Sequence, residues 1–451
     1  MNTIAAISTP YGTGGIAVLR VSGPEALTIV ETLTCPLQSA KPYTIHHTTL
    51  HRDSEVLDEV LVSVFRAPHS FTGEDVVEIA CHGSLFIQQE ALQWLTDAGC
   101  RLAQPGEFTQ RAFLNGKMDL TQAEAVADLI AAETKAEKDL ALTQLRGGIT
   151  SELQTLRDQL LHFTSLIELE LDFADHEELE FADRTELKTL ADTIHERLTA
   201  LTTSFQTGNA IKNGILVAIV GPTNAGKSTL LNALVGEDRA IVSDIAGTTR
   251  DTIEDRIIID GFLFRLIDTA GLRDTNDTIE SLGIERTRQA IQNAQIIIYV
   301  EDVNAPTNEF AIPEGKTVIK VKNKVDLLND QMVNDAYGEA DRTNEMSKEM
   351  VNVFISAKYG HIEPLKQALL QYAKSNLRQN GTVISNARHY DALQRAKQAI
   401  ERVQTGLDQQ LSGELLSLDL QDCLNALGEI TGQITSQEVL NNIFSKFCIG
   451  K

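Results

Sequence analysis

Several features that mark secreted or membrane proteins are missing from this 451-residue chain. It contains no Cys-x-x-Cys pair, which argues against a zinc site or a disulfide framework and favours a reducing cytoplasm. Its cysteines are few and widely spaced: Cys35, Cys81, Cys100, Cys423 and Cys448. No apolar run approaches the ~18–20 residues that span a bilayer, and the start of the chain has no basic region typical of a signal peptide. We therefore expect a cytoplasmic protein with no membrane association.

Positive charge is also scarce, because 39 Lys and Arg residues stand against 63 Asp and Glu residues and leave a net charge of −24. Binding to a nucleic-acid backbone relies on clustered Lys and Arg side chains, which displace counterions from the phosphates. The chain has no such cluster and carries acidic runs such as 172–180. If a nucleic acid is bound, we expect a basic partner protein to hold most of it.

The length and the apolar pattern predict a multidomain protein of about three domains with ~100–200 residues each. Residues 1–118 mix strand-like runs with turns and helix, which is typical of an α+β domain. Residues 119–213 and 377–451 have helical periodicity, whereas 214–376 alternate strand and helix as in a doubly wound sheet. We expect the α/β domain to be inserted into one all-α helical domain.

Individual elements follow from the same periodicity. Strands are expected at 16–21, 60–65 and 76–80, and in the α/β region at 216–220, 253–259, 262–267, 296–300, 317–321 and 351–355. Helices are expected at 85–98, from a Thr121-x-x-Glu124 capping box to the glycines at 147 and 148, at 151–172, at 185–205 and after a box at Thr435-x-x-Glu438. The segment 208–214 is interpreted as a linker.

A phosphate-binding loop is the first chemical motif, with the spacing Gly-x-x-x-x-Gly-Lys-Ser at 221–228. A buried-strand run precedes it and a helix follows it, which is the context that such a loop requires. Backbone N–H groups and the helix N-terminus would cradle the phosphates. Lys227 would reach the β- and γ-phosphates, and the Ser228 hydroxyl would bind Mg²⁺. The motif predicts a nucleoside triphosphate site.

Two further motifs indicate that the base is guanine. In Asn323-Lys-Val-Asp326, the Asp326 carboxylate can accept both the N1–H and the exocyclic amine of guanine, a donor pair that adenine lacks. Ser356-Ala-Lys358 follows the last predicted strand and would support the base from behind. The order of these motifs along the chain makes GTP the expected nucleotide.

The γ-phosphate would be sensed by Asp268-Thr-Ala-Gly271. Asp268 ends a predicted strand and would hold Mg²⁺ through water, while the Gly271 amide would meet the γ-phosphate. A threonine in 247–251, which we expect to be Thr249, would complete the Mg²⁺ shell. The next residue is Leu272, where many signalling GTPases have a water-positioning Gln.

Hydrolysis without that Gln needs another positive charge between the β- and γ-phosphates. The Asn224 carboxamide oxygen, with backbone carbonyls from 243–248, could bind K⁺ there; the alternative is that Asn224 only caps the loop. Arg250 and Arg273 could act as arginine fingers or simply pair with acids. Glu280 lies where a water-orienting base belongs, or it is a carboxylate at a helix start.

The chain resembles the tRNA modification GTPase family known as MnmE or TrmE over essentially its full length. Within the α/β region the resemblance rests on 221–228, on Asp244-Ile-Ala-Gly-Thr-Thr-Arg-Asp251 and on Asp268-Thr-Ala-Gly-Leu-Arg273. Outside it, the matching segments are Pro105-Gly-Glu-Phe-Thr-Gln-Arg-Ala-Phe-Leu-Asn-Gly-Lys117 and Phe447-Cys-Ile-Gly-Lys451. A generic GTPase has no reason to contain these two.

The resemblance implies an N-terminal domain that dimerises and binds a tetrahydrofolate derivative, 5-formyl- or 5,10-methylene-tetrahydrofolate. It implies a Ras-like GTPase domain that K⁺-dependent dimerisation activates. It also implies a heterotetramer with an FAD-dependent flavoprotein of the MnmG/GidA family. That complex would place a 5-carboxymethylaminomethyl or 5-aminomethyl group on the wobble uridine of certain tRNAs. A ribosome-assembly-type GTPase and a one-carbon enzyme that GTP regulates are the alternatives.

The resemblance and the motifs together assign residues to the sites. The nucleotide set is Asn224, Ala225, Gly226, Lys227, Ser228, Thr229, Ser243, Asp244, Ile245, Ala246, Gly247, Thr248, Thr249, Asp268, Thr269, Ala270, Gly271, Asn323, Lys324, Asp326, Ser356, Ala357 and Lys358. Within it, K⁺ would be bound by Asn224, Ser243, Ile245 and Thr248, and Mg²⁺ by Ser228 and Thr249. The catalytic residues would be Glu280, Asn224 and Thr249. Folate would contact Arg20, Glu78, Lys117 and Lys451, whose alternative is solvated surface charge.

Overall fold

The computed structural model describes residues 2–172, 184–238, 254–268, 288–305, 316–328, 350–377 and 382–450. Its internal contacts divide the chain into two compact units. The first comprises residues 1–130, 142–194 and 395–451, and the second comprises 131–141 and 195–394. No helix in the described ranges is both long and apolar enough to cross a membrane. The predicted domain boundaries stay predictions.

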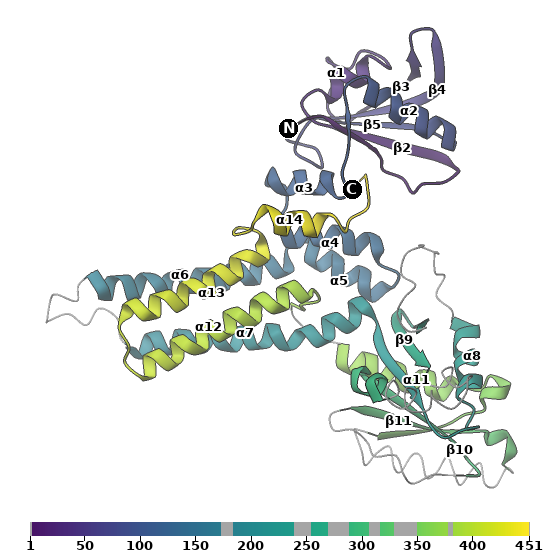
Figure 1. Ribbon diagram of the computed structural model, residues 1–451, viewed down its shortest axis with the longest axis vertical. Helices are drawn as coiled ribbons and strands as arrows, with labels where there is room; N and C mark the ends of the chain where they lie inside the picture. Colours follow the sequence, from purple (N-terminus) through teal and green to yellow (C-terminus); the bar gives the residue numbers. More distant parts are fainter. Residues whose placement is uncertain are drawn as a thin grey trace, which may run out of the picture. The chain divides into compact units, whose positions relative to one another are not determined.

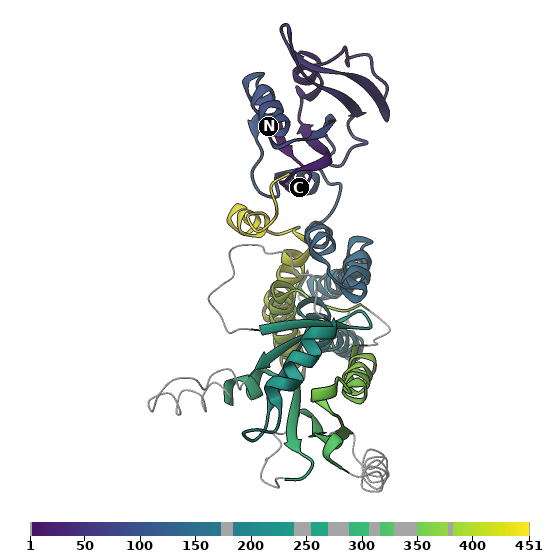
Figure 2. The same ribbon diagram turned by 90° about the vertical axis from the view of Figure 1, so that its right-hand side faces the viewer.

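The first unit begins with a six-stranded sheet in the order β3-β4-β5-β2-β1-β6. Its strands are β1 (Ile4–Ile7), β2 (Gly14–Ser22), β3 (Thr44–Arg52), β4 (Glu55–Phe65), β5 (Val76–Gly83) and β6 (Arg101–Leu102). All described pairs are antiparallel except β1 with β6. Helices α1 (Ala26–Glu31) and α2 (Leu85–Asp97) cover one face of the sheet (Figure 1, Figure 2). The α+β prediction is confirmed, and β1, β3 and β6 are additional strands.

Alternating side chains bind this sheet to its helices. Val60, Val62 and Val64 of β4 are buried, while Leu61 between them is exposed, as expected for a strand with one covered face. Trp94 and Leu95 of α2 join these valines in one apolar cluster. The neighbouring α3 (Glu107–Leu114) packs Phe108 against the first strand.

Long helices make up the rest of the first unit and continue into the second. They are α4 (Leu120–Ala131), α5 (Lys135–Leu145), α6 (Gly148–Asp172), α7 (Arg184–Asn213), α12 (Ala387–Asp408), α13 (Gly413–Thr431) and α14 (Gln437–Phe444). Helices α6 and α13 run side by side (Figure 1). Ion pairs join α12 to α13, with Arg395 on Glu429 at 2.6 Å and Arg402 on Asp422 at 2.9 Å.

The predicted helix starts need correction. Asp119, not Thr121, caps α4: its Oδ1 accepts the Gln122 N–H at 2.9 Å, and the Gln122 Oε1 accepts the Asp119 N–H at 3.0 Å. This reciprocal box lies two residues before the predicted one, because a carboxylate accepts N–H groups at a helix N-terminus better than a hydroxyl does. At α14 the Ser436 hydroxyl accepts the Val439 N–H at 3.3 Å, so Thr435 is not the cap.

Two other helix predictions were wrong in extent. The single helix from 121 to 147 is broken at 132–134, because the Thr134 hydroxyl accepts the Glu137 N–H at 3.2 Å and starts a new helix. The segment 208–214 is not a linker, since α7 continues to Asn213. At Gly208, helix α7 passes close to the backbone of Ile384. A Cβ at this position would lie 2.2 Å from the Ile384 carbonyl oxygen.

The second unit contains a six-stranded sheet in the order β12-β11-β10-β7-β9-β8, parallel except for the β8–β9 pair. Its strands are β7 (Ile215–Val220), β8 (Glu254–Ile259), β9 (Phe262–Asp268), β10 (Ile296–Asp302), β11 (Thr317–Asn323) and β12 (Met350–Phe354). These match the six predicted strands. The continuous apolar runs in β7 and β10 are explained by burial on both faces of the sheet.

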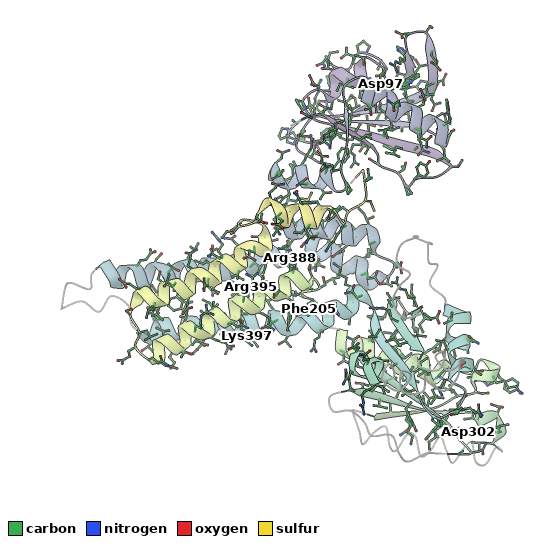
Figure 3. The ribbon with its side chains drawn as sticks, viewed as in Figure 1. Asp97, Phe205, Asp302, Arg388, Arg395 and Lys397 are labelled. Atoms are coloured by element: carbon green, nitrogen blue, oxygen red, sulfur yellow. The ribbon has the colours of Figure 1, made fainter. Side chains whose placement is uncertain are left out.

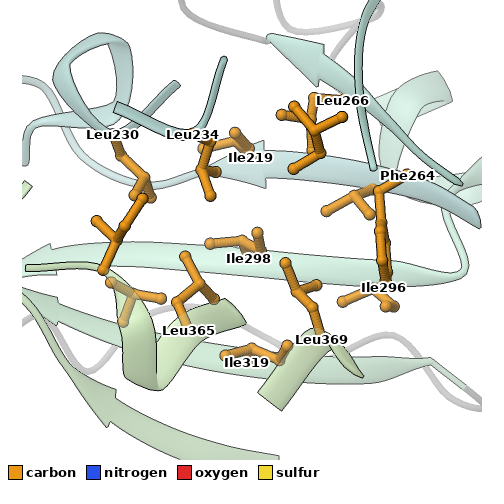
Figure 4. Close-up of a cluster of buried hydrophobic side chains, with 14 of the residues drawn as sticks. Ile219, Leu230, Leu234, Phe264, Leu266, Ile296, Ile298, Ile319, Leu365 and Leu369 are labelled. Atoms are coloured by element: carbon orange, nitrogen blue, oxygen red, sulfur yellow. The ribbon is translucent and has the colours of Figure 1, made fainter. Parts of the chain in front are cut away.

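Helices on both faces provide that burial. On one face, Leu230 and Leu234 of α8 (Lys227–Asp238) and Leu365 and Leu369 of α11 (Glu363–Leu377) pack on isoleucines of the sheet (Figure 4). On the other face, Ala290 and the residues near it pack on the alternate strand positions. The predicted doubly wound α/β architecture is confirmed, and its loops at the strand ends carry the site.

Candidate nucleotide site

The loop at 221–228 leaves β7 and enters α8 at Lys227. Its backbone is left-handed at Asn224, with φ of 61°, and at Gly226, with φ of 98°. Glycine adopts such angles without strain, and asparagine tolerates them better than most residues do. A Cβ at Gly226 would also lie 2.2 Å from the Asn323 Nδ2 atom. The loop conformation therefore depends on these residue types, and it brings backbone N–H groups to the N-terminus of α8.

Lys227 is almost buried, and its Nζ atom reaches back across the loop. It donates to the Gly221 carbonyl at 2.9 Å and to the Pro222 carbonyl at 2.8 Å. The ammonium is thus held over the loop, where it can meet a phosphate. The side chains of Asn224, Ser228 and Thr229 are exposed on the same loop and first helical turn, so a ligand can reach their oxygens.

Asn323 connects the three predicted motifs. It is 2% exposed, its Nδ2 donates to the Ala225 carbonyl at 2.9 Å, and its Oδ1 accepts the Ala357 N–H at 3.1 Å. One side chain at the end of β11 therefore braces both the phosphate loop and the Ser356-Ala-Lys358 segment. The three motifs lie together, as expected for the carboxyl ends of parallel strands in one sheet.

Asp326 is held in place by the segment that follows β12. The buried Ser356 hydroxyl donates to its Oδ1 at 2.5 Å, and the Val325 N–H donates to the Ile355 carbonyl at 3.2 Å. Ser356 thus orients the Asp326 carboxylate. This role adds to the expected one, in which the 356–358 segment supports the base from behind. Lys358 lies with its Nζ 5.2 Å from the centre of the Tyr359 ring.

Part of the predicted site lies outside the described residues. Asp268 ends β9 and stands in register with Ile219 of β7, so its backbone lies at the same sheet edge as the phosphate loop. The following residues are not described: Ser243, Asp244, Ile245, Ala246, Gly247, Thr248, Thr249, Thr269, Ala270, Gly271, Glu280 and Lys451. Their roles stay predictions, as do those of Arg250 and Arg273.

The predicted folate residues lie in the first unit. Arg20 of β2 and Glu78 of β5 are in register, with 2.9 Å between Nε and Oε1 and 2.8 Å between Nη2 and the same oxygen. The rings of Phe71 and Phe108 each have their centre 5.6 Å from the Arg20 guanidinium carbon. Both charged side chains are about a quarter exposed, at 22% and 27%. An ion pair that is mostly buried and lies against aromatic rings differs from the solvated surface charge that was the alternative.

Of the other two folate candidates, only Lys117 lies within the described residues. Lys117 donates from Nζ to the Pro68 carbonyl at 2.9 Å, in the loop that also carries Phe71. The terminal segment lies beside β1, because the Gly450 carbonyl accepts the Ser8 hydroxyl at 3.2 Å. The structure places Arg20 and Glu78 in contact, and it places Lys117 in the segment after α3, hydrogen-bonded to the loop that carries Phe71.

A buried ion-pair network that the sequence analysis missed surrounds α3. Arg111 donates to Glu74 Oε2 and to Glu107 Oε1, each at 3.0 Å. Glu107 also accepts from the Arg101 guanidinium and from the Gln104 N–H. Burial alone would raise the pKa of Glu107, but these hydrogen bonds outweigh it and lower the pKa. The i, i+4 spacing of Glu107 and Arg111 could have indicated this ion pair from the sequence. The ion pair also gives part of the 105–117 motif a structural role.

A doubly wound sheet with this phosphate loop, the Asn323 brace and the Asp326–Ser356 pair defines a P-loop GTPase. Two family models match the chain: "GTP-binding protein TrmE N-terminus" over residues 3–117 and "MnmE helical domain" over residues 120–448. The chain belongs to the tRNA modification GTPase MnmE family, and it is a GTPase of that family.

Full-length relatives support this assignment. A protein named tRNA modification GTPase MnmE from Parabacteroides distasonis is 53% identical over 468 residues, with 100% of both chains covered. Proteins of the same name from Bacteroides fragilis and Flavobacterium johnsoniae are 52% and 48% identical, with 100% of this chain and 99% of each relative covered. The predicted family and the predicted GTPase class are confirmed.

Proposed function

We propose that this protein is a K⁺-stimulated GTPase that acts with a flavoprotein to modify the wobble uridine of certain tRNAs. The modification would be 5-carboxymethylaminomethyl or 5-aminomethyl, with a tetrahydrofolate derivative as the one-carbon donor. The observation that carries the nucleotide part is the braced arrangement of Asn323, Asp326 and Ser356 at the end of β11 and beyond β12. It presents one oriented carboxylate to a base beside a phosphate loop.

Guanine fits this arrangement because the Ser356 hydroxyl donates to Asp326 Oδ1 and so fixes the orientation of the carboxylate. The N1–H and the exocyclic amine of guanine are adjacent donors that match a carboxylate. The phosphates would lie along the loop N–H groups at the start of α8, with Lys227 close to the terminal ones. Adenine offers an acceptor where guanine has N1–H, so Asp326 would repel it.

Mg²⁺ fits the same edge of the sheet because the donors there are oxygens. The Ser228 hydroxyl is exposed in the first turn of α8, and Asp268 ends the strand beside β7. Ser228 and Thr249 would hold the ion directly and Asp268 through water. Bound Mg²⁺ would neutralise charge that develops on the β- and γ-phosphates during transfer to water.

K⁺ would take the role that an arginine finger has in other GTPases. The exposed Asn224 side chain, set by its left-handed backbone, offers a carboxamide oxygen beside the loop. Ser243, Ile245 and Thr248 would complete the site. Bound K⁺ would supply positive charge between the β- and γ-phosphates. Glu280 would orient the attacking water, because Leu272 stands where a Gln would do so.

A folate derivative would bind at the Arg20–Glu78 pair, with Lys117 and Lys451 near the carboxylates of its glutamate tail. Glu78 can accept the amine and ring N–H of a pterin, and the aromatic rings beside Arg20 suit a flat heterocycle. We propose a homodimer that assembles with an FAD-dependent MnmG/GidA-type flavoprotein as a heterotetramer. The net charge of −24 favours the partner as the main holder of tRNA. A cytoplasmic location is part of this proposal.

The test is mass spectrometry of wobble uridines in tRNA from cells that lack the protein. We expect the modified uridines to disappear and to return with the wild-type gene but not with Lys227→Ala. Unchanged uridines in the deletion strain would refute the tRNA part. Full rescue by a Lys227→Ala protein that no longer binds GTP would refute the dependence on the nucleotide.

A further inference from the structure

Asp302 is the last residue of β10, beside the end of β11 (Figure 3). Its Oδ2 atom lies 2.8 Å from Lys324 Nζ, and its Oδ1 accepts the backbone N–H of Asn304 at 2.9 Å. Both carboxylate oxygens are therefore engaged. The sequence motifs gave Asp302 no role, and the proposed function has not used it.

Lys324 is fixed at its backbone as well as at its ammonium. Its φ of 67° is left-handed, its carbonyl accepts the Leu327 N–H at 3.0 Å, and the preceding Asn323 carbonyl accepts the Val303 N–H at 3.0 Å. The Lys324 side chain is thus held at its backbone end and at its ammonium. This side chain is 32% exposed, so a ligand can reach part of it.

Lys324 precedes Asp326 by two residues in the chain. The Asp326 carboxylate would set the plane in which guanine lies. Lysine stems pack along flat apolar surfaces while the charged end stays with a polar partner. An unanchored lysine would lose rotamer freedom when a base stacked on it. An anchored stem has already lost that freedom on folding, so binding does not incur the loss again.

We propose that Asp302 is a positioning residue for the nucleotide: it holds Lys324 extended so that the lysine stem forms a preformed support for the guanine ring. This inference rests on the proposed guanine site. It predicts that Asp302 contributes to the affinity for the base through Lys324 and has no part in the hydrolytic step. The hydrogen bond from Lys324 and, to a smaller extent, that from the Asn304 N–H keep the Asp302 pKa below its ordinary value, so this carboxylate is ionised at neutral pH.

The experiment measures binding of N-methylanthraniloyl-GDP to the full-length protein and to four variants: Asp302→Asn, Asp302→Ala, Lys324→Ala and the double variant Asp302→Ala/Lys324→Ala. We expect Asp302→Ala to weaken binding about tenfold, the loss associated with one immobilised long side chain, mainly through faster dissociation. Asp302→Asn keeps an oxygen that accepts the Asn304 N–H, so the loop should not be disturbed. It removes the charge that holds Lys324, so binding should weaken as it does in Asp302→Ala. For the two Asp302 variants the loss should appear in the KM for GTP and not in kcat, because support of the base is the same in the ground state and the transition state.

The double variant separates positioning from other roles. If Asp302 acts through Lys324, the double variant binds no more weakly than Lys324→Ala. A matched control is Asp260→Asn, which removes a 2.7 Å ion pair with Lys374 and should leave binding unchanged.

Three results would overturn the inference: wild-type affinity in both Asp302 variants, additive losses in the double variant, or a lowered unfolding midpoint of nucleotide-free Asp302→Asn that accounts for its weaker binding. Equal affinity of the wild type for the GDP and ADP probes would instead refute the proposed guanine site.

Discussion

Replacing Asn323 with Ala tests how the site is assembled. In the structure this side chain satisfies two buried backbone groups, the Ala225 carbonyl at 2.9 Å and the Ala357 N–H at 3.1 Å. Asn323→Ala leaves both without a partner. An unsatisfied buried polar group costs about 1–3 kcal/mol, and the 2% exposure of Asn323 limits access of water. We expect the free energy of unfolding of the second unit to fall by about 2–4 kcal/mol.

The assay is urea unfolding of the nucleotide-free protein, followed by fluorescence of a probe in the α/β domain. Both hydrogen bonds exist without a nucleotide, so the loss should be seen in its absence. GDP affinity should fall in addition, because the phosphate loop and the 356–358 segment are no longer joined. Asn213→Ala is the control: it removes an exposed 2.7 Å bond to Asn209 and should change stability by less than about 0.5 kcal/mol.

The reasoning would be refuted if Asn323→Ala lost GDP affinity while its nucleotide-free stability matched that of Asn213→Ala. Asn323 would then contact the nucleotide without bracing the protein. A stability loss with unchanged GDP affinity would refute the other half of the reasoning, namely that the brace keeps the loop in its binding conformation.

Three further predictions follow from contacts and burial. Gly226→Ala should weaken GTP binding at least tenfold by equilibrium titration, because the new Cβ clashes with Asn323 and the backbone is left-handed, a strain of about 1–3 kcal/mol; undiminished affinity would contradict the loop geometry. Because the Glu107 pKa is lowered in the folded protein, ionised Glu107 stabilises the fold above the ordinary carboxyl pKa of about 4.3, and this contribution is lost as the pH falls further. Glu107→Gln should therefore flatten the acid side of a plot of unfolding free energy against pH. An unchanged acid side would show that Glu107 does not contribute to this pH dependence. Burial raises the pKa of the Cys423 thiol to about 12, so a thiol reagent at pH 8 should label exposed Cys448 and spare Cys423 until the protein unfolds; early labelling of Cys423 would show that α13 opens.

The α/β domain was predictable because its signals are local. Buried strands such as β7 and β10 are continuous apolar runs, and the loop after β7 has its own spacing of glycines and lysine. In contrast, β3 has one fully buried residue, Leu50, in a polar stretch, and it is a strand because β4 provides a partner along its whole length. Such edge strands depend on pairing with distant residues, which periodicity does not report.

The same distinction separates the parts of the site. Asp326 and Lys227 belong to motifs whose spacing is their signal. Asp302 and Arg111 bind partners 22 and 37 residues away, and only the folded chain brings those partners near. The break before α5 had a local signal in Thr134, but the helical periodicity on both sides concealed it.

The central proposal is that this GTPase depends on K⁺ in place of the missing Gln. Its most direct test is the rate of GTP hydrolysis in KCl and in NaCl at equal ionic strength, for the wild type and for Asn224→Ala. We predict a rate at least about tenfold higher in KCl for the wild type, as expected when one charge is removed from the transition state, and no such difference for the variant. Equal wild-type rates in the two salts, or a KCl stimulation that Asn224→Ala retains, would contradict it.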